Sequence, residues 1–154
     1  MQYDIQQIND FARALYGAER KLQIVPYGLT TAFAALAQNA TLTNVINVNA
    51  NADFIMLAIR HRSQIGGAQT FATGTVPFIR ILITDTGTGE QYTNSAVDLQ
   101  NYSVNGQFTR QLPYPRWISG RTALSLQATN YAPTAETYTT TDVYLDGVLV
   151  RVLG

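Results

Sequence analysis

The spacing of hydrophobic positions changes along the chain. Near the N-terminus apolar residues recur every three or four positions, at Ile5, Ile8, Phe11, Ala12, Leu15 and Tyr16. This spacing places them on one face of a helix. Asp4 can cap the start of that helix, and Gly17 can end it in a backbone conformation that favours glycine. The pattern therefore predicts a short helix over residues 4–16.

Most of the remaining chain is typical of β-strands. Apolar runs of strand length, rich in β-branched residues, are bounded by turn-forming residues. These runs cover residues 42–48, 53–60, 76–84, 96–100, 122–129 and 143–150. Within the last run, Asp146-Gly147 separates two short apolar stretches. Because this dipeptide favours the tightest hairpin turns, it predicts a β-hairpin there.

The succession of strands indicates the fold. Turn pairs such as Gly66-Gly67, Asn105-Gly106 and Ser119-Gly120 recur between the strands, and no helical pattern intervenes. We therefore expect an all-β fold, an antiparallel β-sandwich or jelly roll over residues 51–154, preceded by an N-terminal arm with one short α-helix over residues 1–50.

The second part of this arm has a weaker pattern. Residues 22–25 predict a short strand that Pro26 stops, because proline lacks the N–H that a sheet needs. Residues 32–39 are compatible with one or two helical turns or with an extended segment. We therefore expect residues 18–52 to be extended or irregular.

Composition adds information about the surface. Only 13% of the residues are charged, ten basic and ten acidic, and Lys21 is the only lysine. Surface charge keeps monomers soluble, and arginine, unlike lysine, is enriched at protein interfaces. We interpret this composition as a surface that partners cover. A net charge of zero gives no reason to expect nucleic-acid binding.

Two absences limit the function further. The chain has no cysteine, which excludes disulfides, thiolate metal sites and cysteine nucleophiles. No apolar run reaches the length of a membrane span, and the first residues lack the features of a signal peptide. We therefore expect no membrane partner and no export.

Asp85-Thr86-Gly87 is the strongest catalytic candidate. It follows an apolar strand, as the same triplet does in aspartic proteases of the retroviral type, where two subunits each contribute one Asp to a shared site. The chain lacks room for the helix that such proteases place after their second motif. The alternative is a hairpin turn over residues 85–90, whose Asp, Thr and Gly content turns prefer. The sequence favours the turn.

His61 is the only histidine, so any histidine-based triad would depend on it. It lies between Arg60 and Arg62, and two neighbouring cations disfavour a bound metal ion. We therefore interpret His61 as a residue of a loop or a strand end. We expect no catalytic residues, no cofactor and no metal ligands.

Residues 112–121 (LPYPRWISGR) combine two prolines with Tyr114, two arginines and Trp117, the only tryptophan. Together with Tyr102 and other aromatic residues nearby, they could form a platform on which sugar rings stack. The alternative is a rigid turn with Trp117 in the core, because aromatic residues are the commonest core and interface anchors. The alternative is favoured, and Tyr114 and Trp117 remain candidates for a ligand or interface loop.

Residues 53–151 together resemble small virion proteins of tailed bacteriophages. The features that carry the resemblance are Ala52-Asp53-Phe54, residues 78–85 (FIRILITD), residues 96–99 (AVDL), residues 115–121 (PRWISGR), residues 124–130 (LSLQATN) and a closing strand before Asp146-Gly147. The resemblance implies a β-sandwich that decorates or cements a capsid, or lies at the neck or tail. It implies no catalytic residues.

These observations lead to three hypotheses for function. The first is a non-enzymatic capsid decoration or cement protein that forms a dimer or trimer and binds the major capsid protein in the virion. In this hypothesis Ile5, Ile8, Phe11 and Leu15 of the arm pack on a neighbouring subunit or on the capsid. The second is a carbohydrate-binding sandwich of a tail or receptor-binding assembly, and the third is an aspartic protease that uses Asp85.

Overall fold

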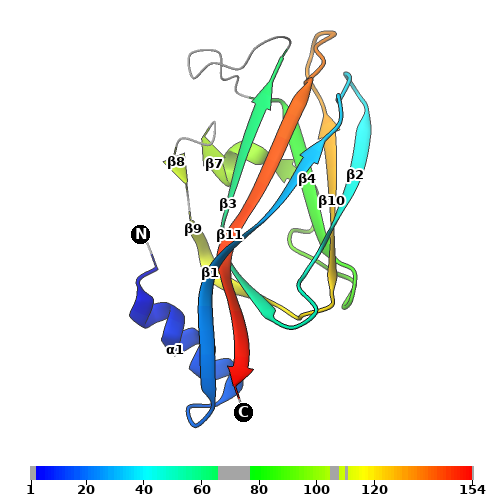
Figure 1. Cartoon of the computed structure of the whole chain (residues 1–154). Coiled ribbons are helices and arrows are strands. Elements are labelled where there is room, and N and C mark those ends of the chain that lie inside the picture. Colours follow the sequence, from blue (N-terminus) through cyan, green and yellow to red (C-terminus); the bar gives the residue numbers. More distant parts are fainter. Residues whose placement is uncertain (1–2, 66–76, 105–107, 110, 154) are drawn as a thin grey trace.

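In the computed structural model, the described residues are 3–65, 77–104, 108–109 and 111–153. Within them, strands form two antiparallel sheets that pack face to face, and a short helix lies near the N-terminus (Figure 1). The protein is therefore an all-β sandwich with a short N-terminal helix, which confirms the predicted fold class.

The helix α1 spans Ile5–Tyr16, and the other elements follow it in chain order. They are β1 (Lys21–Phe33), β2 (Thr41–Asn47), β3 (Asp53–Gln64), β4 (Ile79–Asp85), β5 (Glu90–Gln91), β6 (Val97–Asp98), the short 3₁₀ helix η2 (Leu99–Asn101), β7 (Ser103–Val104), β8 (Phe108–Thr109), β9 (Gln111–Ile118), β10 (Ala123–Asn130) and β11 (Thr140–Leu153).

Sheet I has the strand order β1-β11-β3-β9, and sheet II has the order β2-β10-β4-β5. In the described part of the chain, β6 also pairs with β4, and β7 pairs with β8 in a small separate ribbon. The core between the sheets contains Phe54 and Leu145 from sheet I and Ile81 and Leu126 from sheet II. Burial of such side chains is the main source of stability in a fold of this kind.

The helix α1 covers part of the outer face of sheet I. Its start is a capping box: the Asp4 carboxylate accepts the N–H of Gln7 at 2.7 Å, and the Gln7 side chain accepts the N–H of Asp4 at 3.1 Å. Gly17, at φ 96°, ends the helix as predicted. Ile8, Phe11, Ala12 and Tyr16 of α1 pack on sheet I and form a second hydrophobic cluster there.

This second cluster explains why residues 53–60 are apolar without alternation. Phe54 and Met56 of β3 belong to the sandwich core, whereas Ile55 and Leu57 lie in the cluster beneath α1. A strand that is buried on both faces has no need of polar positions. Leu57 is also the extra residue of a β-bulge, because Ala58 and Met56 pair with consecutive residues of β11.

The predicted hairpin at Asp146-Gly147 is wrong. β11 runs through this pair without a turn, with β1 on one side and β3 on the other. Gly147 lies at the bulge of β3, where the backbone of Ile55 approaches too closely for a side chain. An Asp-Gly pair suits both a tight turn and a site of close backbone approach, so the local sequence did not distinguish them.

Residues 18–52, expected to be extended or irregular, are mostly extended, but they belong to the sandwich and not to a separate arm. β1 and β2 occupy most of them, and each is an edge strand of one sheet. Among residues 3–52, the helix, the turn after it and the connections at 34–40 and 48–52 lie outside the sheets. Pro26 does not stop the first strand, because an edge strand pairs on one side only and tolerates a missing N–H. Residues 32–39 are extended at first, and Leu36 then pairs with Tyr138 in an isolated bridge.

The other strand predictions agree with the structure in varying degree. The runs at 42–48, 53–60 and 122–129 correspond to β2, β3 and β10, and β4 begins a few residues after the predicted start at 76. Of residues 96–100, only the pair in β6 is a strand, and η2 follows it. Ser119-Gly120 forms a turn as expected, whereas the Gly66-Gly67 and Asn105-Gly106 turns lie outside the described residues.

Candidate functional site

A bulge in β9 forms the rim of a groove at the edge of sheet I. Arg116 of β9 pairs with Met56 of β3, but the next paired residues are Gln111 and Ala58, so residues 112–115 (LPYP) form a bulge without partners in β3. Two of these four residues are prolines, which cannot donate to a neighbouring strand and are found at edges and bulges. As a result Tyr114 is 72% exposed.

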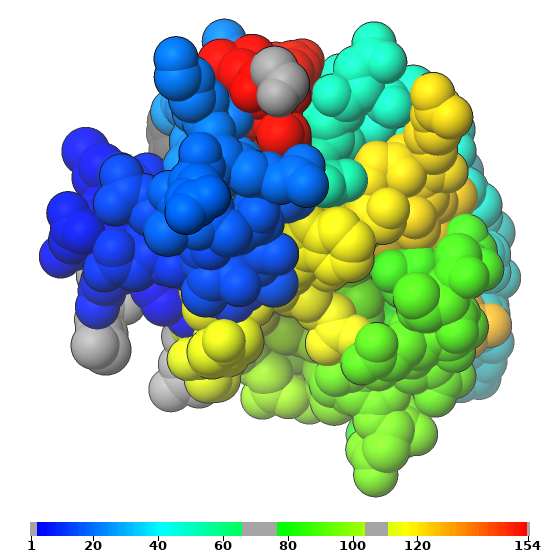
Figure 2. Space-filling model, turned by 90° about the horizontal axis from the view of Figure 1, so that it is seen from below, coloured from blue at the N-terminus to red at the C-terminus, as the bar shows by residue number. Residues whose placement is uncertain are grey.

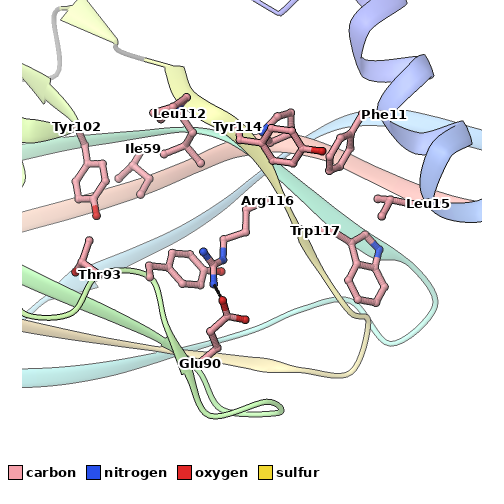
Figure 3. A pocket seen from close by; sticks show the side chains of 13 residues that line it. Phe11, Leu15, Ile59, Glu90, Thr93, Tyr102, Leu112, Tyr114, Arg116 and Trp117 are labelled. Carbon is pink, nitrogen blue, oxygen red and sulfur yellow. Dashed lines mark ion pairs between the residues drawn. The ribbon is translucent and has the colours of Figure 1, made fainter.

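The helix α1 forms the opposite wall of this groove. The rings of Phe11 and Tyr114 meet edge to face, with centroids 5.3 Å apart, and Leu15 lies one turn further along the helix (Figure 3). Figure 2 shows the helix in blue, β9 in yellow and the segment after β4 in green side by side on one face. The groove therefore lies where three segments distant in sequence meet.

A chain of hydrogen bonds fixes the helix against β9. The indole Nε1 of Trp117 donates to the hydroxyl of Tyr16 at 2.7 Å, and this hydroxyl donates to the Asp53 carboxylate at 2.5 Å. The second oxygen of Asp53 accepts the N–H of Gly120 at 2.6 Å. Burial, and then the bond to Asp53, raise the pKa of Tyr16. The position of Trp117 is thus set by the helix and not by the core.

The floor of the groove joins the two sheets. Arg116 reaches from β9 to Glu90 of β5, with 2.9 Å between Nη2 and Oε1, and its guanidinium lies 3.8 Å from the centroid of the Tyr92 ring (Figure 3). The groove has a volume of about 600 Å³, and Ile59, Tyr102 and Thr93 are among the other residues that line it. It combines apolar rings with a fixed pair of opposite charges.

Two tyrosines contribute phenol side chains to the lining of the groove, Tyr92 and Tyr102. The hydroxyl of Tyr92 is buried. Burial is the main cause that raises the pKa of Tyr92, and it also raises the pKa of Tyr102. Both phenols are therefore neutral hydroxyl groups at physiological pH.

A second hollow lies on the other flank of α1. Three cations, Arg13, Arg20 and Lys21, line it together with Asn9, Leu22, Ile24 and Leu153. Within the described residues, none of the three cations forms an ion pair with a carboxylate. This hollow therefore carries an excess of positive charge at the end of the molecule where α1, the start of β1 and the end of β11 meet (Figure 1).

The structure separates the candidate interface residues of the helix into two pairs. Ile8 and Phe11 pack in the cluster on their own sheet. Ile5 and Leu15 are 79% and 46% exposed. The helix therefore does not extend away from the sandwich, and only Ile5 and Leu15 leave substantial apolar surface for a partner.

The candidate loop residues Tyr114 and Trp117 both line the groove. Trp117 is 42% exposed, so the interpretation as a residue that fills the core is wrong. Tyr102 lies in the same groove. Sequence reasoning missed Glu90 and Tyr92, because no pattern in the sequence indicates that the segment after β4 lies beside β9.

The two catalytic candidates have structural roles in the described residues. Asp85 ends β4, and its Oδ1 accepts the N–H groups of Gly87 and Thr88 at 2.9 and 3.3 Å, so residues 85–90 form the expected hairpin turn. His61 is buried within β3, three residues before the strand ends, and not in a loop or at the last residue of a strand as expected. Its Nε2 donates to the carbonyl oxygen of Ser103 at 2.6 Å.

The described residues contain neither a candidate metal site nor a candidate membrane-spanning helix. No group of three or more His, Asp or Glu side chains in this part of the chain could hold a metal ion. Nor does it contain a helix long and apolar enough to cross a membrane.

Comparisons with known proteins define no family for this chain. No family model matches the sequence, and no curated protein matches it. Among solved structures, a weak match is a chain in the structure of infectious bursal disease virus, Gx strain, with 13% sequence identity and a TM-score of 0.28. The similarity covers 88% of this chain but only 37% of the viral chain. Similarity of this degree does not define a function.

Proposed function

We propose that this protein is a non-enzymatic structural protein of a bacteriophage virion. It acts there as a capsid decoration or cement protein that forms a dimer or trimer and binds the lattice of the major capsid protein. The resemblance of residues 53–151 to small virion proteins of tailed phages supports this proposal, and so does the low content of charged residues. Proteins whose surface is covered in an assembly need less charge to stay soluble.

The observation that carries the proposal is the positive hollow beside α1. Three of the ten basic residues of the chain, Arg13, Arg20 and Lys21, line this one hollow. Leu153, which is 49% exposed, lies at its border. Cations next to exposed apolar surface suit a protein partner that offers carboxylates, because opposite charges guide and orient association. The partner surface that fits is therefore an acidic patch of the capsid.

The exposed apolar residues of the helix support self-association. Ile5 presents most of its side chain to solvent, and an exposed isoleucine at a helix start gains free energy when a second copy covers it. A small homo-oligomer brings several positive hollows to a symmetric capsid at once. Such multivalent contact strengthens binding without a stronger single contact.

Capsids that lack this protein provide the test. Capsids of the phage whose genome carries the gene are prepared without the protein, and binding of the purified protein is measured by co-sedimentation. The variant Arg13→Glu with Lys21→Glu reverses two charges in the hollow. Arg62→Glu is the control, because Arg62 is exposed on β3 outside both hollows.

We expect the wild type and the control to bind, and the double variant to bind at least about tenfold more weakly, as is typical when opposite charges at an interface are reversed. Binding of the wild type should weaken as salt increases. Absence of wild-type binding would contradict the proposal, as would equal binding of the double variant.

Point variants are preferable to deletion of residues 1–20, because deletion would uncover Ile55 and Val148. Light scattering measures the mass of the protein in solution. A monomeric mass would refute the proposed dimer or trimer.

A further inference from the structure

The groove between α1 and β9 offers flat aromatic surface at its rim. Tyr114 is 72% exposed, and Trp117 is 42% exposed. Neither ring can turn freely, since Phe11 packs against Tyr114 and Tyr16 bonds the indole nitrogen of Trp117. Rigid exposed aromatic rings lose little conformational entropy when a ligand covers them.

The floor of the same groove offers a hydrogen-bond donor beside an acceptor. The ion pair with Glu90 and the ring of Tyr92 hold the guanidinium of Arg116 in place from two sides. A guanidinium has five N–H donors, so the contact with Glu90 alone does not exhaust it. The carboxylate of Glu90 accepts hydrogen bonds only, and its side chain is 66% exposed.

Hydroxyl-bearing side chains are the second polar feature of this groove. Tyr102 and Thr93 are among the residues that line it. A hydroxyl group can both donate and accept a hydrogen bond, and so can the hydroxyl groups of a ligand.

We propose that this groove binds a carbohydrate, one or two sugar rings of a glycan. The apolar face of a sugar ring stacks on Tyr114 and Trp117, and neighbouring sugar hydroxyls bond Arg116 and Glu90. The volume of about 600 Å³ lies in the range of small-molecule sites. A proline-rich peptide also stacks on aromatic rings, but it has no adjacent hydroxyls to match a donor beside an acceptor, so the lining favours a sugar.

This inference goes beyond the proposed function and is independent of it. The groove and the positive hollow lie on opposite flanks of α1 and share no lining residue. The two proposals can therefore fail separately: a protein that does not bind capsids can still bind a sugar, and a protein that binds no sugar can still bind capsids.

The test measures sugar binding directly. Saturation-transfer NMR is recorded with a panel of common bacterial monosaccharides and disaccharides, and an array of bacterial surface polysaccharides is probed in parallel. Tyr114→Ala removes the most exposed ring, and Glu90→Gln replaces the carboxylate. Tyr27→Ala is the matched control, because Tyr27 is 44% exposed on β1 and does not line the groove. Thermal unfolding of each variant checks that the fold is kept.

We expect saturation transfer to at least one sugar of the panel. Tyr114→Ala should lower the affinity about tenfold or more, which corresponds to the loss of one stacked ring, and Glu90→Gln should lower it several-fold. The control should bind as the wild type does. The inference is overturned if no sugar or polysaccharide binds, or if Tyr114→Ala binds as well as the control. Binding of a proline-rich peptide in place of sugars would also overturn it.

Discussion

Gly147 of β11 lies directly against the backbone of Ile55 in β3. A β-carbon at position 147 would lie 2.0 Å from the carbonyl oxygen of Ile55 and 2.9 Å from Cζ of Phe54. The first of these atoms belongs to the backbone and cannot move aside without displacing β3. Close contact of the two strands at the bulge therefore requires glycine at this position.

Gly147→Ala should accordingly destabilise the protein by about 3 kcal/mol or more, because the added methyl group overpacks a rigid site. Urea unfolding followed by far-UV circular dichroism measures this change in free energy. Gly28→Ala is the control in the neighbouring strand, where an added β-carbon would have no contact shorter than 3.8 Å. If the two variants are equally stable, the bulge geometry is incorrect.

Tyr16→Phe should loosen the docking of the helix. The change removes the hydroxyl that joins Trp117 to Asp53, and loss of these bonds should lower the free energy of unfolding by about 1–2 kcal/mol. Because Trp117 is the only tryptophan, its fluorescence reports this contact directly. We expect a shifted emission and faster amide exchange in α1. Tyr27→Phe should change neither, and an unchanged Tyr16→Phe spectrum would argue against the contact.

His61 should make the stability depend on pH below about 6.5. Its pKa is lowered, mainly by burial, so the unfolded chain binds a proton at a higher pH than the folded chain does. Stability is therefore complete above the unfolded pKa and declines as pH falls below it. Urea unfolding between about pH 7.5 and 5.5 measures this slope, before most carboxylates titrate. His61→Gln should flatten the slope, and a slope that persists would assign it to other groups.

The hydrogen bonds that the Asp85 carboxylate accepts should stabilise the turn over residues 85–90. Asp85→Asn keeps an oxygen that can accept the N–H of Gly87, so it should be close to neutral, whereas Asp85→Ala should destabilise by about 1–2 kcal/mol. The same proteins test the protease hypothesis. Cleavage of unstructured peptides at acid pH by the wild type, abolished in Asp85→Asn, would establish an enzyme and contradict the proposed function.

The class of fold was predictable because its evidence is local. The helix follows from the spacing of Ile8, Phe11 and Ala12 and from its capping residues, and β10 follows from the alternation of Leu124 and Leu126. These patterns depend on which face of an element is buried, and they are present in any short window of the sequence.

What the sequence could not predict depends on contacts between distant segments. The continuous apolar run in β3 exists because α1 covers the outer face of its sheet, and the role of Gly147 depends on a bulge in a different strand. The same distinction explains why only part of the groove was predictable. Tyr114 and Trp117 stand in a conspicuous aromatic and proline-rich stretch, but Glu90 and Tyr92 reach the groove only through the packing of the two sheets.

The extra residue in β3 has a consequence for how the protein unfolds. Leu57 shifts the alternation of the strand by one position, so that the same twelve residues supply both the sandwich core and the cluster beneath the helix. Two hydrophobic clusters that shared no strand could melt in separate steps. Here they share the backbone of β3, and disorder in one is transmitted to the other along a single strand. The helix is therefore part of the same cooperative unit as the sandwich, and the whole molecule should unfold in one transition.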